Sequence, residues 1–273
     1  MPLSLLSPLD RWKAPAPAPG RVAWLRGATF AHRGLHGPGV PENSLSAARA
    51  ALARGLGIEC DVHKSSDGHP IVFHDETLER LTGERGRVAD RSAAQLGAMA
   101  LAGSTDTIPT LRQLLDLVNG QVPLLIELKA PENRPIGALC LAVRRVLEGY
   151  RGPYGVMSFD PRIVRWFLVH SPHIVRGLVV SEQDDKALAG RLRRHRMLWQ
   201  AKPDFLSYDI RDLPGRFPAA QRERGLGLAT WTVRSPDQLE RALALTDAPT
   251  VEGGGVPALP ADPAPAVEGD EGP

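Results

Sequence analysis

The chain has 273 residues, 42% of them apolar, and a formal net charge of +2 at pH 7. This composition provides enough apolar residues for a full core and argues against global disorder. The nearly balanced charge gives no indication of nucleic acid as a partner. The length fits two small domains or a single α/β barrel, because such barrels commonly reach about 250 residues as one domain.

The cysteines and the N-terminal residues bear on where in the cell the protein is expected to be. Cys60 and Cys140 are the only cysteines, too few for a disulfide framework, and we expect both to be buried thiols. The first ten residues lack the basic segment and the apolar core of a secretory signal. No stretch of the sequence approaches the roughly 18 continuous apolar residues of a membrane span. We therefore expect a reduced, cytoplasmic protein without a transmembrane segment.

Both ends of the chain differ in composition from the rest. Residues 1–27 are expected to form an N-terminal extension, in which residues 13–20 alternate Ala and Pro and predict a stiff linker. The segment before this linker is compatible with a short docking helix, which the sequence does not decide. Residues 253–273 are rich in Gly, Pro and acids and hold few large apolar side chains, so they predict a disordered tail.

Over residues 28–252, short apolar stretches alternate with helical patterns. The stretches that predict buried strands are 28–33, 57–62, 124–129, 155–159, 175–181, 205–209, 228–232 and 249–252. The helical patterns between them are 44–54, 110–118, 135–148, 161–170, 184–197, 216–224 and 236–245. Eight strands joined by helices predict a (β/α)8 TIM barrel of the α/β class. A doubly wound open sheet is less favoured, because polar residues end most strands rather than gathering at one switch point.

The segment of about 63–109 interrupts this alternation after the second strand. It begins with S-S-D-G at 65–68 and H-P-I-V-F at 69–73, which predict a β-hairpin, and it continues through a loop with Arg and Gly. We expect a small insertion in the barrel, close enough to the C-terminal ends of the strands to shape the entrance of a site there.

Three acidic residues interrupt apolar runs. Glu59 and Asp61 lie two apart on one predicted strand, so both carboxylates project to the same face. Glu127 lies in L-L-I-E-L-K on the next barrel strand, where a metal or Lys129 is its natural counter-charge. A buried carboxylate without a partner is costly, which makes plain surface carboxylates the weaker interpretation. The set predicts a site for one divalent cation, Mg2+ or Ca2+, with Mn2+ also possible.

Two histidines stand beside charged residues at strand ends. His32 and Arg33 end the first predicted strand, where an arginine can hold a phosphate and a histidine can act as acid or base. His74 follows the run I-V-F, and Asp75 could fix its tautomer. A lone histidine is usually a structural residue, but these neighbours favour catalysis. The remaining histidines are interpreted as surface or loop residues: His36, His63, His69, His170, His173 and His195.

Glu42 and Trp231 are candidates for the rim of the site. Glu42 precedes a predicted helix in P-E-N-S, so it is either part of a plain helix cap or a partner that neutralises Arg33. Asn43 and Ser44 are interpreted as structural capping residues. Trp231 belongs to the apolar core in most proteins, but at the end of a barrel strand it could form the wall of a pocket for a small polyol.

The ordered motifs resemble the glycerophosphodiester phosphodiesterase family over about residues 28–252. The motifs are H-R-G (32–34), P-E-N-S (41–44), E-C-D-V (59–62), D-G (67–68), H-D (74–75), L-E-R-L-T-G (78–83), E-L-K (127–129) and W-T-V (231–233). The resemblance implies a (β/α)8 barrel with an insertion after the second strand and a divalent cation. It also implies hydrolysis of a small-molecule glycerophosphodiester to an alcohol and sn-glycerol 3-phosphate.

The resemblance also implies a role for each matching residue. It makes Glu59, Asp61 and Glu127 the metal ligands, His32 and His74 the catalytic acid/base pair, and Arg33 and Lys129 the catalytic phosphate-binding cations. Trp231 and Glu42 remain further substrate-binding candidates on their positions alone. The family's last strand commonly reads D-G-I-I-T-D-x-P, and this chain has only A-P-T-V-E-G at 248–253. The closing strand is therefore the least well matched part.

Two other functions remain open. A lysophospholipase D-type phosphodiesterase on the same barrel would need an apolar groove, and the insertion holds apolar residues that could supply one: Leu78, Leu81, Leu96, Met99 and Leu101. A non-catalytic protein that binds a phosphate ligand would not need two titratable histidines. We therefore predict an enzyme, a phosphoric diester hydrolase that uses His/His acid-base catalysis.

Overall fold

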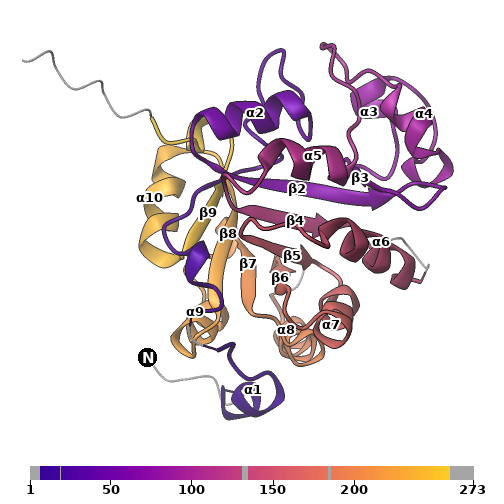
Figure 1. Cartoon of the computed structure of the whole chain (residues 1–273). Coiled ribbons are helices and arrows are strands. Elements are labelled where there is room, and N and C mark those ends of the chain that lie inside the picture. Colours follow the sequence, from indigo (N-terminus) through magenta and orange to yellow (C-terminus); the bar gives the residue numbers. More distant parts are fainter. Residues whose placement is uncertain (1–6, 19, 131–134, 184–185, 259–273) are drawn as a thin grey trace, which may run out of the picture.

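The computed structural model describes residues 7–18, 20–130, 135–183 and 186–258. Within these ranges eight parallel strands form a closed barrel, with helices around it (Figure 1). The ring closes because β1 pairs with both β2 and β9. In ring order the strands are β1 (Phe30–Ala31), β2 (Gly57–Lys64), β4 (Leu124–Leu128), β5 (Tyr154–Ser158), β6 (Val175–Val180), β7 (Phe205–Asp209), β8 (Gly227–Val233) and β9 (Ala248–Val251). The predicted (β/α)8 barrel is confirmed.

Helices connect the consecutive barrel strands. They are α2 (Leu45–Ala53), α5 (Leu111–Val118), α6 (Gly137–Leu147), α7 (Pro161–His170), α8 (Leu188–Ala201), α9 (Arg216–Glu223) and α10 (Pro236–Leu245). Ser44, Asp160 and Ser235 accept hydrogen bonds from the first turns of their helices, and Thr110 forms a capping box with Gln113. None of the helices in the described ranges has the length and apolarity to cross a bilayer.

Phe205 fills the interior of the barrel near the N-terminal ends of the strands. A Cβ atom at Gly177 on β6 would lie 2.3 Å from its ring, so that position requires glycine, and one at Gly227 on β8 would make a tight contact of 3.0 Å with its Cβ. The short helix η1 (Ala23–Leu25) contributes Leu25 to the same buried cluster. Two larger apolar clusters lie between the strands and the surrounding helices.

The segment between β2 and β4 folds around its own small core. Its strand β3 (Pro70–Val72) pairs antiparallel with β2, and it also contains α3 (Glu79–Thr82), η2 (Val88–Asp90) and α4 (Ala93–Gly97). In Figure 1 these elements lie together at one side of the barrel. The buried side chains of this core are Ile71, Phe73, Leu78, Val88, Leu96, Leu101 and Ile108.

The N-terminal helix α1 (Ser7–Lys13) docks on α8 through a buried acid. Asp10 accepts hydrogen bonds from His195 Nδ1 at 2.8 Å, Trp199 Nε1 at 2.8 Å and Gln221 Nε2 at 2.9 Å. The interpretation of His195 as a surface residue is therefore wrong, because its side chain is buried against an acid 185 residues earlier in the chain. The short docking helix that the sequence left undecided is present.

The first strand is shorter than the predicted range of 28–33. The backbone turns immediately after Ala31, with φ of 54° at Arg33 and 78° at Gly34. A Cβ atom at Gly34 would lie 2.8 Å from Ala47 Cβ, so this turn needs glycine for space as well as for its positive φ. The turn takes His32 and Arg33 out of the strand and places both at the pocket described below.

The closing strand is present despite its weak sequence match. β9 pairs with β1 and β8, and the chain continues into η4 (Gly253–Gly255), where Gly255 is buried. Val256 packs against the apolar clusters, and Arg54 donates a 2.5 Å hydrogen bond to the carbonyl of Pro257. The structured part thus extends past 253, where the sequence predicted that the disordered tail begins, and residues 259–273 lie outside the described residues.

Candidate active site

A pocket of about 210 Å³ lies at the C-terminal ends of the barrel strands. Its lining residues come from both ends of the barrel sequence and are His32, Arg33, Glu59, Asp61, His74, Glu127, Lys129, Met157, Phe159, Trp231, Thr232, Arg234 and Thr250. Of the residues that the sequence singled out, Glu42 does not line the pocket. A neighbouring hollow of about 380 Å³ shares Glu127, Lys129 and Phe159 with it.

The three predicted metal ligands lie together on neighbouring strands. Glu59 and Asp61 are two residues apart on β2, and the strand register sets Asp61 opposite Glu127 on β4. One carboxylate oxygen from each lies within 4.8 Å of the others, and the three residues are only 2%, 2% and 7% exposed. This is a compact, buried set of hard oxygen donors of the kind that Mg2+ and Ca2+ prefer.

The pKa values of the three buried carboxyl groups are shifted, and two of them are raised. Burial raises the pKa of Glu59 well above its usual value, and repulsion by Asp61 and Glu127 raises it further. Burial also raises the pKa of Glu127. Burial would raise the pKa of Asp61 too, but attraction by Lys129, His74 and Arg33 outweighs it and holds that pKa at about 2. A divalent cation among the three carboxylates would favour the charged form of each.

Lys129 and Asn43 fix the orientation of Asp61. Lys129 Nζ lies 2.8 Å from Asp61 Oδ1 and also contacts Glu127. Asn43 donates a 2.9 Å hydrogen bond from Nδ2 to Asp61 Oδ2, and its Oδ1 accepts from the Asp61 amide at 3.2 Å. Asn43 was interpreted from sequence as a helix cap, and that interpretation is incomplete because its side chain reaches the predicted metal ligand.

Arg33 is held beside the carboxylates by both its backbone and its side chain. Its amide donates to Glu59 Oε2 at 3.1 Å, and its Nε lies 3.4 Å from Asp61 Oδ2. Its Nη1 donates a 2.7 Å hydrogen bond to Glu42, which also accepts from Arg80. Of the two interpretations of Glu42, the geometry therefore favours the partner of Arg33.

His74 is oriented by a carboxylate, as its sequence context suggested. Its Nδ1 lies 2.7 Å from Asp75 Oδ1, and Arg80 anchors Asp75 through a 2.5 Å hydrogen bond to Oδ2. Burial lowers the pKa of His74, and nearby Lys129 lowers it further, against an opposing effect of Asp61. His63, interpreted as a surface or loop residue, instead lies half-buried on β2 and contacts the backbone carbonyl of His74 through Nε2 at 2.9 Å, so that interpretation is also wrong.

His32 has a carboxylate partner that the sequence analysis missed. Its Nδ1 contacts the carboxylate of Glu252, the residue directly after β9, and Arg234 holds the other oxygen of Glu252 at 2.5 Å. Burial would raise the pKa of Glu252, but His32, His36 and Arg234 outweigh it and hold the pKa well below its usual range. A signal was available, because Glu252 is an acid directly after a barrel strand, where barrel enzymes place their site residues.

Trp231 forms part of one wall of the pocket. Its indole Nε1 donates a 3.0 Å hydrogen bond to the carbonyl of Ser207, which fixes the ring on β8. The ring of Phe159 meets it edge to face, with centroids 5.5 Å apart and an interplanar angle of 84°. Phe159 is 44% exposed, which is unusual for a large apolar side chain, so the pocket has an apolar wall open to the outside.

Sequence comparison identifies relatives over most of the barrel. A model of the Glycerophosphoryl diester phosphodiesterase family matches residues 32–248. A glycerophosphodiester phosphodiesterase from Caldanaerobacter subterraneus is 26% identical over 225 residues, which cover 78% of this chain and 88% of that protein. Human glycerophosphodiester phosphodiesterase 1 is 30% identical over 147 residues, or 50% of this chain. That alignment spans only 44% of the human protein.

Solved structures share the same fold. A phosphodiesterase from Oleispira antarctica, solved in complex with the product sn-glycerol-3-phosphate, has a TM-score of 0.69 and 26% identity and covers 83% of this chain and 93% of that one. The glycerophosphodiester phosphodiesterase of Thermotoga maritima has a TM-score of 0.65 and 23% identity, covering 82% and 94%. Because the family match spans nearly the whole barrel, the chain belongs to the glycerophosphoryl diester phosphodiesterase family.

Proposed function

We propose that this protein is a metal-dependent phosphodiesterase that hydrolyses glycerophosphodiesters to an alcohol and sn-glycerol 3-phosphate. The observation that carries the proposal is the content of a single pocket: three carboxylates, three cationic side chains and two histidines that are each paired with a carboxylate. The sn-glycerol-3-phosphate complex of the Oleispira antarctica phosphodiesterase supports this choice of product.

Glu59, Asp61 and Glu127 would hold the divalent cation, Mg2+ or Ca2+, with Mn2+ also possible. The three oxygen donors and the raised pKa values of Glu59 and Glu127 fit such an ion. When bound, the cation would neutralise charge that develops on the phosphate oxygens. Lys129, which contacts Asp61 and Glu127, supplies part of the same positive charge.

Arg33 and Lys129 bind the phosphodiester, and the two histidines transfer protons. Contacts to Asp61 and Glu42 orient the guanidinium of Arg33 at the pocket, so little side-chain entropy is lost when it binds phosphate. Carboxylates hold Nδ1 of His32 and of His74, which leaves Nε2 of each ring for proton transfer. One Nε2 takes a proton from the nucleophile, either water or the glycerol 2-hydroxyl, and the other protonates the leaving alkoxide.

The two alternative functions are less well supported by the geometry. A lysophospholipase D-type activity was expected to use apolar residues of the insertion, but Leu78, Leu96 and Leu101 are buried in the core of that insertion. The exposed Phe159 beside Trp231 is the apolar feature that still favours it. A non-catalytic binding protein gives no reason for two histidines that are each oriented by a carboxylate.

A substrate panel with and without EDTA separates the three functions. We expect hydrolysis of glycerophosphocholine to stop with EDTA and to return with Mg2+, Ca2+ or Mn2+. Bis(p-nitrophenyl) phosphate reports general phosphodiesterase chemistry, and lysophosphatidylcholine reports the lysolipid activity. Asp61→Asn should fold but bind the cation far more weakly, since it keeps the side-chain volume and removes the ligand charge. Full activity after rigorous metal removal would contradict the metal assignment, and no turnover of any substrate would favour the binding protein.

A further inference from the structure

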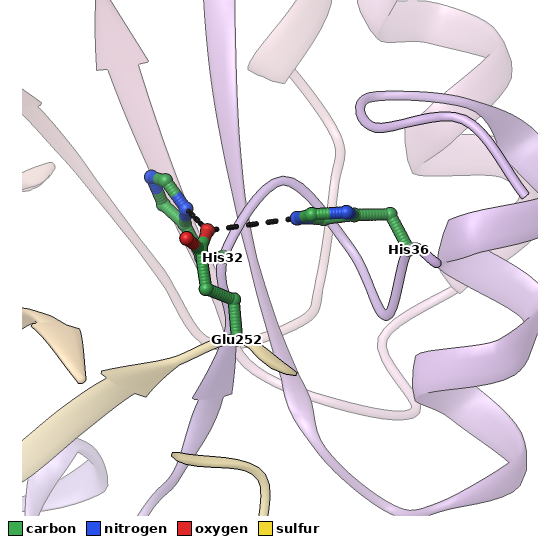
Figure 2. A group of neighbouring side chains, drawn as sticks. All are labelled: His32, His36 and Glu252. Carbon is green, nitrogen blue, oxygen red and sulfur yellow. Dashed lines mark hydrogen bonds and ion pairs between the residues drawn. The ribbon is translucent and has the colours of Figure 1, made fainter. Parts of the chain in front are cut away.

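A second group of potential metal ligands lies beside the carboxylate trio and contains nitrogen donors. His32 follows β1, His36 lies in the loop between β1 and α2, and Glu252 follows β9. One ligand atom from each lies within 4.8 Å of the others. Figure 2 shows the two imidazole rings approaching the same carboxylate, each with a ring nitrogen directed at it.

Within this group, His36 is the residue whose imidazole has no partner within hydrogen-bond distance among the described residues. Its Nε2 is buried and, among the described residues, makes no hydrogen bond; Glu252 Oε2 lies 3.6 Å away. That oxygen already contacts His32 Nδ1, and Arg234 occupies the other oxygen of Glu252. A buried ring nitrogen whose carboxylate partner lies just beyond hydrogen-bond distance is incompletely satisfied, and a ligand bound closer to it would stabilise it.

The loop that carries His36 is tied to the barrel, so the ring is held in place. The amide of Leu35 donates to the carbonyl of Ala47 on α2 at 3.0 Å, and Gly37 forms a two-way bridge with Val40. The side chain of His36 is 25% exposed, which leaves a path from solvent to the group. His36 is therefore positioned toward Glu252 and remains accessible to a small ion.

We infer that His32, His36 and Glu252 form a Zn2+ site distinct from the carboxylate trio. Two imidazoles and one carboxylate are a donor set that binds Zn2+ with a fourth position open, whereas Mg2+ and Ca2+ prefer all-oxygen sets such as the trio. The ion would satisfy Nε2 of His36 and replace the proton between His32 Nδ1 and Glu252. Arg234 would stay on Glu252 Oε1 and orient the carboxylate.

Occupation of this site inhibits the enzyme, a consequence that rests on the proposed function. Zn2+ on Nδ1 of His32 keeps the proton of that ring on Nε2 and removes its ability to exchange a proton during turnover. The proposed site adjoins the pocket, because His32 and Arg234 both line it. Zn2+ at this site would therefore lower the activity of an enzyme whose catalytic cation binds elsewhere, at the carboxylate trio.

Two variants of His36 and one matched control test the site. Zn2+ affinity is measured by competition with a chromogenic chelator in the full chain, with excess Mg2+ present to fill the carboxylate trio. His36→Ala removes one ligand, and His36→Gln keeps a polar side chain of similar size if the alanine variant does not fold. His69→Ala is the control, because His69 is exposed and lies in the hairpin loop between β2 and β3.

We expect wild type and His69→Ala to bind one Zn2+ and to lose turnover as it binds. Both His36 variants should bind Zn2+ at least about tenfold more weakly and keep turnover at the same Zn2+ concentration. Unchanged affinity in both His36 variants overturns the site and assigns the Zn2+ effect to the carboxylate trio. Zn2+ binding that depends on His36 but leaves turnover unchanged supports the site and instead contradicts the catalytic role of His32.

Discussion

At the residue scale, each candidate catalytic histidine has a carboxylate on Nδ1. Asp75 holds His74 and is itself anchored by Arg80, and Glu252 holds His32 and is anchored by Arg234. A carboxylate on Nδ1 fixes the tautomer of a histidine and stabilises its protonated form. The two histidines of the pocket thus have the same kind of support, a carboxylate anchored by an arginine, from two separate parts of the chain.

Glu252→Gln tests this arrangement at His32. The amide keeps the shape of the side chain but removes the charge that stabilises a protonated ring, so kcat should fall by about 10²-fold. KM should change little, because Glu252 is not expected to bind the phosphate. Glu252→Asp keeps the charge and should recover part of the rate. Steady-state kinetics and the pH profile of both variants check this, and wild-type kcat in Glu252→Gln would contradict the role.

The sequence predicted most residues of the site, but it did not predict which distant residues they contact. Glu59, Asp61 and Glu127 were visible because acids in apolar runs need a counter-charge nearby. Glu252 and His195 were missed, since their partners lie 220 and 185 residues away, and no local pattern reports a pairing across that distance. The sharp turn at Arg33 was also hidden, because its positive φ depends on how Gly34 packs against α2.

At the element scale, most strands and helices follow from local signals. Short apolar runs gave the barrel strands, and capping residues such as Thr110 and Asp160 marked where helices begin. The docking of α1 is different, because it depends on the buried Asp10 and on residues of α8 and α9. The stability of this contact should therefore depend on the charge of one side chain.

The pH dependence of folding tests the contact through Asp10. Hydrogen bonds from His195, Gln221 and Trp199 outweigh burial and lower the pKa of Asp10 below its ordinary value of 3.8. A carboxyl with a lowered pKa in the folded state stabilises the fold above the ordinary value and loses that contribution as pH falls through the lowered one. The nearby basic groups, His195 and Arg224, favour the charged form.

Asp10→Asn removes this charge with little change in volume. The difference in free energy of unfolding between wild type and Asp10→Asn should be largest above about pH 4 and should shrink at lower pH. Urea unfolding of both proteins at several pH values measures it. A difference that stays constant from neutral pH down to strongly acidic pH would show that Asp10 does not act through its charge.

At the scale of the whole molecule, the barrel is completed by residues that lie after its last strand. Val256 packs against both large apolar clusters, and Arg54 binds the carbonyl of Pro257. Beyond residue 258 the sequence has only two large apolar side chains, Leu259 and Val267, so removing that segment takes away little apolar surface. Truncation points on the two sides of Val256 should therefore differ in effect.

A pair of truncations measures this difference. Ending the chain after Ala258 should leave Tm and activity nearly unchanged. Ending it after Gly253 should lower Tm by several degrees, because the packing of the partly buried Val256 and the contact to Pro257 are lost. Thermal unfolding of the full chain and both truncated forms checks the prediction. Equal Tm values for the two truncations would contradict the packing role of residues 254–258.

The proposed reaction depends on the two histidines at one pocket, and their removal tests it most directly. Formation of sn-glycerol 3-phosphate from glycerophosphocholine is measured for wild type, His32→Ala, His74→Ala and the exposed control His69→Ala, all at saturating divalent cation. We predict that each catalytic variant loses about 10²-fold or more in kcat while cation binding and fold are retained, and that His69→Ala matches wild type. Near-normal turnover in both His32→Ala and His74→Ala would contradict the proposed catalysis.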